Sequence, residues 1–210
     1  MNYSKAPWAA EPGQTISYVS CHDNHTLWDK LEISNPTASE EERIKMHKLA
    51  ETIVLTSQGV PFLHAGMEFL RTKQGVENSY NSPDSINQLD WRRKEKYKEV
   101  FEYYKQLIAL RKNHPAFRMT STAQIQAHLE FLPYEGENFL AYQLKNNANG
   151  DNWHTILVLL NGSGLNKTIE LPDGEWTLVA DGNQVNEQGL KSSSRVMTIP
   201  ASTAFILKKD

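Results

Sequence analysis

The feature that most constrains the fold of this chain is a polar pair, His22-Asp23, placed directly after a short apolar run. Gln14 to Ser20 is rich in β-branched and aromatic residues and follows Pro12-Gly13, a pattern that predicts a strand. In α/β barrels the chemistry lies at the carboxyl ends of parallel strands, where a charged side chain can face a ligand without being buried in the barrel. The pair therefore predicts a barrel strand that ends at a ligand-binding cleft.

The next hundred residues predict two helices and a second strand. Ser39 and Glu42 have the spacing of a capping box, and apolar residues recur at helical spacing from Met46 to Val54. Val60 to Ala65 is predicted to be a short buried strand. A loop of about 25 residues follows, and loops of this length inside a compact domain are usually functional. Roughly Lys94 to Lys112 is predicted to be a second amphipathic helix.

From about residue 117 the pattern changes to short alternating or apolar runs separated by Gly, Asn, Asp and Pro. This spacing predicts an antiparallel β-sandwich. The predicted strands are Ile125 to Leu132, Asn138 to Leu144, Thr155 to Leu160, Lys167 to Leu171, Trp176 to Ala180, Arg195 to Ile199 and Ala204 to Lys208.

Three motifs, in order along the chain, resemble the α-amylase superfamily, glycoside hydrolase family 13. Tyr18-Val-Ser-Cys-His-Asp-Asn-His-Thr-Leu-Trp-Asp-Lys-Leu31 resembles the fourth conserved region of that family, and its ending is similar to the type I pullulanase branch. Gly59 to Phe69 resembles the eighth barrel strand with its following loop, and Asn78 to Trp91 the pullulanase loop that comes next. The resemblance covers residues 16 to 113.

The resemblance implies an α/β plus all-β architecture. Residues 1–116 are expected to be the last two strand-helix units of a (β/α)8 barrel, followed by an antiparallel β-sandwich C-terminal domain over residues 117–210. A barrel of this kind needs eight units in about 250 residues. The chain therefore corresponds to about a quarter of a barrel, and its expected partner is the missing N-terminal barrel portion, in cis or as a separate chain.

The implied function is that of the C-terminal portion of a pullulanase-type hydrolase, which cuts α-1,6-glucosidic bonds in pullulan, starch or glycogen with retention. In the family the Asp matching Asp23 stabilises the transition state. Retaining glycosidases also need two carboxyl groups about 5 Å apart, and the family's nucleophile is an Asp two residues after an Arg. No Arg here has that neighbour, and Glu175, beside Gly174, is predicted to be a solvated turn residue and not the acid. The isolated chain is therefore predicted to be inactive.

The expected ligand is an α-glucan oligosaccharide or polysaccharide. An ionised Asp23 suits an oxocarbenium-like transition state, and His22 and Asn24 offer the donors and acceptors that a polyol requires. By resemblance, the residues implied to line the sugar cleft are His22, Asn24, Arg71, Asn81 and Asp84.

Three residues near these motifs have structural interpretations as well. Asn24 suits a cap or a turn as readily as a sugar contact. Trp28, at a helical position, is expected to pack as a core aromatic instead of stacking on a sugar. Glu68 is expected to accept backbone N–H groups.

Two rival functions remain open. His22, Asp23 and His25 could form a metal site, although adjacent residues rarely converge on one ion; we expect no metal and no cofactor, with calcium left open for a full-length enzyme. The second rival is a non-catalytic carbohydrate-binding module, for which Tyr134, Tyr142 and Trp153 would be exposed on one sheet face. Each is instead expected to be a half-buried sheet residue.

Charge and hydropathy limit which other classes of partner are expected. A formal net charge of -3 gives no reason to expect nucleic acid or an anionic membrane. The chain contains no export signal and no apolar run long enough to span a membrane, and its localisation stays undetermined. Ile53 and Leu63 would pack on absent barrel strands, so we expect an exposed apolar patch or a complementary polypeptide.

Overall fold

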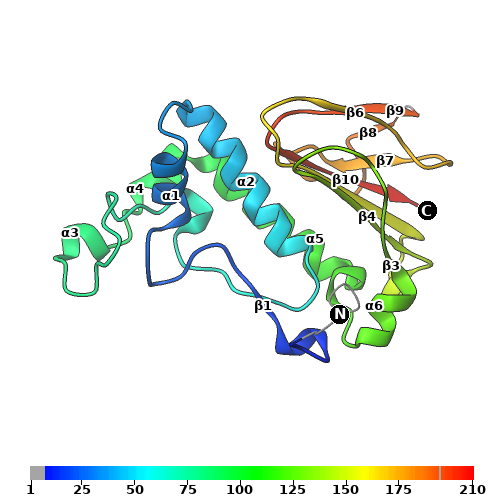
Figure 1. Cartoon of the computed structure of the whole chain (residues 1–210), viewed down its shortest axis with the longest axis horizontal. Helices are drawn as coiled ribbons and strands as arrows, with labels where there is room; N and C mark the ends of the chain where they lie inside the picture. Colours follow the sequence, from blue (N-terminus) through cyan, green and yellow to red (C-terminus); the bar gives the residue numbers. More distant parts are fainter. Residues whose placement is uncertain (1–7, 194) are drawn as a thin grey trace.

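The computed structural model describes residues 8–193 and 195–210. Helices make up most of the amino-terminal part and antiparallel sheets the carboxyl-terminal part, and helices α2 and α5 lie side by side against the larger sheet (Figure 1). The helices are η1 (Pro12–Gln14), α1 (Leu27–Ser34), α2 (Glu40–Thr56), η2 (Met67–Phe69), α3 (Asp84–Asn87), α4 (Arg92–Lys96), α5 (Lys98–Asn113), η3 (Pro115–Arg118), α6 (Thr122–His128) and η4 (Ala148–Gly150). The strands are β1 (Ile16–Ser17), β2 (Val60–Pro61), β3 (Leu129–Phe131), β4 (Phe139–Lys145), β5 (Thr155–Asn161), β6 (Lys167–Glu170), β7 (Thr177–Ala180), β8 (Lys191–Ser192), β9 (Val196–Ile199) and β10 (Thr203–Lys209).

The two strands of the amino-terminal part pair in parallel. Ile16 of β1 is opposite Val60 of β2, and the amide of Phe62 donates to the carbonyl of Ser17 at 2.9 Å. Because the strands are parallel, the segments that leave their carboxyl ends emerge at the same edge. Helices α1 and α2 follow β1, and α4 and α5 follow β2.

Helix α2 begins where the capping box predicted it. The Ser39 side chain accepts from the amide of Glu42, and the Glu42 side chain accepts from the amide of Ser39. At the other end of α2, the buried Arg111 guanidinium of α5 donates to the carbonyls of Leu55, Ser57 and Gly59 at 2.8 to 2.9 Å. These carbonyls include ones that the end of a helix leaves without partners, so Arg111 ties α5 to both α2 and the start of β2.

The second predicted helix is interrupted. Tyr97, with φ -115° and ψ 42°, separates α4 from α5. Its ring is buried beside Trp28 and Val100. The hydrophobic periodicity predicted a single helix. It contains no information on the tertiary packing of Tyr97, which takes this one residue out of helical geometry.

The carboxyl-terminal part is a β-rich domain. Its main sheet has the antiparallel order β3-β4-β5-β10-β7-β8, and its central strand β5 is buried at every position. The small β6-β9 sheet lies over one face of the main sheet, with side chains such as Leu159, Ile169 and Ile199 between them. This agrees with the predicted packing of two sheets.

One predicted strand of this domain is wrong over most of its length. Ile125 to Leu132 begins in helix α6, for which the Ser121 side chain accepts from the amide of Gln124. Only Leu129 to Phe131 pair with β4. The Ser121 cap starts a helix, and this helix places Ile125 in the core. The alternation of apolar and polar residues predicted a strand because it does not include the effect of the cap.

The helices and the main sheet share one hydrophobic core. Leu107 and Leu110 of α5 pack in the same cluster as Ile156 and Val158 of β5. The Tyr142 hydroxyl of β4 also donates to the carbonyl of Thr56, at the end of α2. A domain boundary at residues 116/117 stays a prediction, and this core crosses it.

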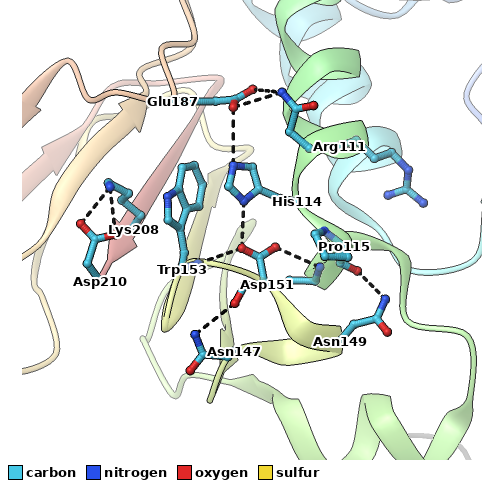
Figure 2. Close-up of polar contacts among 12 residues, drawn as sticks. Arg111, His114, Pro115, Asn147, Asn149, Asp151, Trp153, Glu187, Lys208 and Asp210 are labelled. Atoms are coloured by element: carbon cyan, nitrogen blue, oxygen red, sulfur yellow. Dashed lines mark hydrogen bonds and ion pairs between the residues drawn. The ribbon is translucent and has the colours of Figure 1, made fainter.

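A buried histidine fastens the end of α5 to the sheet domain (Figure 2). The His114 ring stacks on Trp153 with 3.5 Å between ring centroids, and its Nδ1 lies 2.9 Å from Oδ1 of Asp151. Asp151 also accepts from the amides of Ala116 and Trp153, and Glu187 faces the other ring nitrogen at 3.8 Å. Burial raises the pKa of Asp151, but these hydrogen bonds outweigh it and hold that pKa below its usual value.

The β1-β2 pair leaves an exposed apolar edge, made of Ile16, Tyr18, Val60, Phe62 and Leu63. The prediction that Val60 to Ala65 is a buried strand is therefore wrong here: the strand is limited to Val60–Pro61, and among residues 8–193 and 195–210 no second layer covers these side chains. Ile53 on α2 is exposed as well, as the sequence led us to expect. Across the described ranges, no helix combines the length and the apolarity needed to cross a bilayer.

Candidate functional site

Polar side chains from the ends of β1 and β2 meet in one depression of about 260 Å³. His22 and Asp23 follow β1, and His64 follows β2. The long loop after β2 supplies the other wall. The depression is lined by His22, Asp23, His64, Arg71, Lys73, Glu77, Asn78, Ser79, Tyr80 and Asn87.

His22 and Asp23 lie open to solvent at the rim. Their side chains are 86% and 74% exposed, and Nε2 of His22 lies 3.5 Å from Oδ2 of Asp23. Asn24 has a left-handed backbone with φ 60° and does not line the depression. Asn tolerates this conformation well, so the geometry favours the turn interpretation of Asn24.

Arg71 and His64 form the polar floor. Arg71 donates to Nε2 of His64 at 3.0 Å and to the carbonyls of Ala65 and Asn87. A guanidinium can only donate, so Nε2 of His64 is the acceptor and Nδ1 carries the proton that faces Ser20 Oγ at 3.2 Å. Burial, reinforced by the Arg71 charge, lowers the pKa of His64 to about 4. The ring is therefore neutral at pH 7.

The loop that carries Arg71 is held by Asp29 of helix α1. This carboxylate is 2% exposed, and it accepts from the amide of Lys73 at 2.7 Å and from the Thr72 hydroxyl. The Lys73 ammonium is directed back to the carbonyl of Glu77 at 2.9 Å. The Leu-Trp-Asp-Lys-Leu motif thus links the segment after β1 to the segment after β2.

The rest of the loop is fixed by Asn87. Its amide donates to the carbonyls of Ser79 and Ser82 at 2.7 and 3.1 Å. Asn81 and Asp84 are exposed on this loop and do not line the depression. The structure therefore places Arg71 with His22 and Asp23, and leaves Asn24, Asn81 and Asp84 outside the depression.

Sequence reasoning missed His64, Lys73, Tyr80 and Asn87. The signal for His64 was present, because it follows an apolar run as His22 does. No local pattern marks Lys73 or Asn87, since their roles depend on contacts with other segments.

Three further residues have the structural surroundings that the sequence led us to expect. Trp28 is buried, contacts Tyr97 and lies under the Arg43 guanidinium, as predicted. Glu68 accepts from the amide of Gly66 at 2.9 Å, which confirms its expected role, and Glu175 is exposed after the Asp173-Gly174 bend.

Histidines and acids elsewhere offer little to a ligand. His25 faces the carbonyl of Gly75 at 3.2 Å. Over residues 8–193 and 195–210, no group of three or more His, Cys, Asp or Glu side chains has a metal-binding arrangement. The His114-Asp151 pair is closed to ligands, with side chains only 7% and 0% exposed.

The aromatic residues proposed for a carbohydrate-binding sheet face are not exposed platforms. Tyr142 and Trp153 are buried, and the hydroxyl of the partly buried Tyr134 donates to the carbonyl of Glu170 at 2.7 Å. Tyr142 and Trp153 are more deeply buried than the half-buried state expected of them.

Sequence comparison with known proteins finds similarity to pullulanases. A family profile described as "Pullulanase, all-beta domain" matches residues 125–184. The pullulanase of Bacillus subtilis (strain 168) is 49% identical over 177 residues, which is 84% of this chain and 23% of that protein. The chain thus spans about a quarter of the length of this relative.

Solved structures agree with the sequence comparison. The pullulanase from Bacillus acidopullulyticus superposes with a TM-score of 0.92 and 48% identity, covering 95% of this chain and 25% of that one. Pullulanase type I from Bacillus subtilis strain 168, solved with maltose, gives a TM-score of 0.91 and 43% identity over 97% of this chain and 28% of that one.

Proposed function

Because this chain is homologous to type I pullulanases over most of its length, we propose that it forms the C-terminal portion of a pullulanase-type glycoside hydrolase. Its amino-terminal part supplies the last two strand-helix units of a (β/α)8 barrel, and its carboxyl-terminal part the β-rich domain that follows. In this role it contributes one wall of a cleft that binds an α-glucan, and it acts together with the remaining barrel portion, in cis or as a separate chain.

The observation that carries this proposal is the parallel β1-β2 pair with polar residues at one edge. His22 and Asp23 after β1, and His64 and Arg71 after β2, reach the same depression. Active sites of (β/α)8 enzymes lie at this edge. The exposed apolar side of the pair further supports a missing neighbour, because a parallel strand is normally buried on both faces.

Asp23 is the proposed transition-state stabiliser. Hydrolysis with retention passes through an oxocarbenium-like state, and a nearby ionised carboxylate lowers its energy more than that of the ground state. His22 would donate a hydrogen bond to a sugar hydroxyl, and Arg71 would fix the loop beside it. The nucleophile and the acid/base come from the rest of the barrel, so the chain by itself does not turn over pullulan.

A chimera tests this proposal. The chain replaces its matching segment in the Bacillus subtilis pullulanase, and release of reducing ends from pullulan is measured. We expect activity in the chimera and none above background for the chain alone. Asp23→Asn should lower kcat of the chimera by at least about 100-fold, the scale for losing one preorganised electrostatic group, whereas the exposed turn variant Glu175→Gln should leave it unchanged.

Two results would contradict the proposal. One is pullulan cleavage by the chain alone. The other is a chimera in which Asp23→Asn has the same kcat as the parent.

A further inference from the structure

Tyr80 is an exposed aromatic residue in the wall of a polar depression. The residue is 83% exposed, and it lines the same depression as His22, Asp23 and Arg71. A single exposed aromatic residue is common on protein surfaces, but this one lies beside the polar side chains of the depression. The position of Tyr80 therefore needs an explanation.

The backbone around Tyr80 is held in place while its ring stays free. The neighbouring Ser79 is buried, and its carbonyl accepts from the Asn87 amide at 2.7 Å and from the backbone amide of Ser82 at 3.0 Å. Asn87 is in turn contacted by Arg71, whose guanidinium donates to its carbonyl. An immobile backbone with a two-torsion side chain loses little conformational entropy on binding.

The surroundings of Tyr80 match the two kinds of surface on a glucose ring. The faces of the ring present C–H groups, which pack on an aromatic face, and its rim presents hydroxyls, which need hydrogen-bond partners. His22, Asp23 and Asn78 provide polar groups in the same depression, and Tyr80 supplies its apolar surface.

We propose that Tyr80 is a substrate-positioning residue that stacks on a glucose ring of the α-glucan beside His22 and Asp23. This inference rests on the proposed function, and it assigns to one residue the apolar part of sugar recognition. Its phenol hydroxyl is not required, because the contact is made by the ring.

The test measures the maltotriose affinity of the chimera described above, in which the remaining barrel portion completes the cleft, by isothermal titration. Tyr80→Ala should weaken binding about fivefold or more, the scale of an aromatic packing contact. Tyr80→Phe keeps the ring and should bind within about twofold of wild type, since a twofold change is near the smallest effect expected from losing an aromatic contact. Tyr18→Ala is the matched control, because Tyr18 is also exposed, at 55%, but lies outside the depression.

The outcomes separate this inference from the proposed function. If Tyr80→Ala binds as wild type does, or Tyr80→Phe is as weak as Tyr80→Ala, stacking by Tyr80 is wrong while the glucan site stands. If the catalytically active parent chimera shows no saturable binding at the highest soluble maltotriose concentration, the glucan site is wrong, and the assignment of Tyr80 fails with it.

Discussion

At the residue scale, a few buried or partly buried polar side chains fix the loops of the depression. Asp29 satisfies two donors of the loop after β2, and Asn87 satisfies two carbonyls farther along it. Each joins segments that are far apart in sequence. A buried polar group without its partner costs more than the hydrogen bond itself contributes, so these residues are expected to be sensitive to substitution.

Asp29→Ala is predicted to destabilise the chain by about 3 kcal/mol, because it leaves the Lys73 amide and the Thr72 hydroxyl without their acceptor. Urea unfolding followed by circular dichroism measures the change. Asp29→Asn, which keeps one acceptor oxygen, should lose less, and Glu32→Ala on the exposed side of the same helix should be near neutral. An Asp29→Ala variant as stable as wild type would show that the loop does not depend on this anchor.

At the element scale, helix α2 buries ionisable residues against its neighbours. Burial lowers the pKa of His47 to about 4, and burial with the nearby Glu68 charge raises the pKa of Glu51 to about 8. Their side chains approach to 4.0 Å, but at pH 7 both are neutral and form no ion pair. Nε2–H of His47 instead donates to the carbonyl of Met67 at 3.0 Å, which connects α2 to η2.

The raised pKa of Glu51 makes the free energy of unfolding depend on pH, and the direction of this dependence follows from the pKa. The unfolded chain loses this proton near pH 4.5, while the folded chain keeps it to about pH 8. Between these values the folded state binds more protons, so its stability falls as pH rises, by up to about 1.4 kcal/mol per pH unit.

Glu51→Gln, which keeps the shape but cannot ionise, should flatten the stability profile over that range and be more stable than wild type near pH 8. The measurement is the free energy of unfolding in urea across the range. Glu41→Gln, at an exposed position of the same helix, is the control. Parallel profiles for Glu51→Gln and wild type would contradict the assigned pKa.

At the scale of the whole molecule, the β-rich domain and the β1-β2 pair differ in how much of their apolar surface is covered by other elements. The β-rich domain has layers on both faces of its main sheet: α2 and α5 on one side, and β6-β9 on the other (Figure 1). The β1-β2 pair has an uncovered apolar edge. The chain thus has one core that is covered on both faces of the main sheet and one exposed apolar edge.

The edge is predicted to bind a hydrophobic dye and to promote association at high concentration. Ile16→Lys with Val60→Lys, which alters two paired exposed positions, should reduce both effects without lowering the unfolding midpoint. Dye fluorescence and sedimentation velocity measure them. Leu165→Lys, which removes a single apolar residue that is 77% exposed, should change neither, and a wild-type chain that stays monomeric and binds no dye would contradict this prediction.

The sequence by itself determined the features that depend on neighbours a few residues away. The Ser39-Glu42 cap, the strand before His22-Asp23, and most strands of the sheet domain follow from local side-chain chemistry and periodicity, which act over one or two turns of chain. The motifs also predicted that Asp23 and Arg71 face one cleft, and both residues line the same depression.

Only the tertiary structure decided which of these residues meet. It placed His64 against Arg71 and left Asn81 and Asp84 outside the depression. It also interrupted the predicted helix at Tyr97 and placed Ile125 in a helix that contributes to the core. The physical reason is that burial and hydrogen-bond satisfaction are set by segments distant in sequence, such as Asp29 on the loop at Lys73, and no local pattern contains that information.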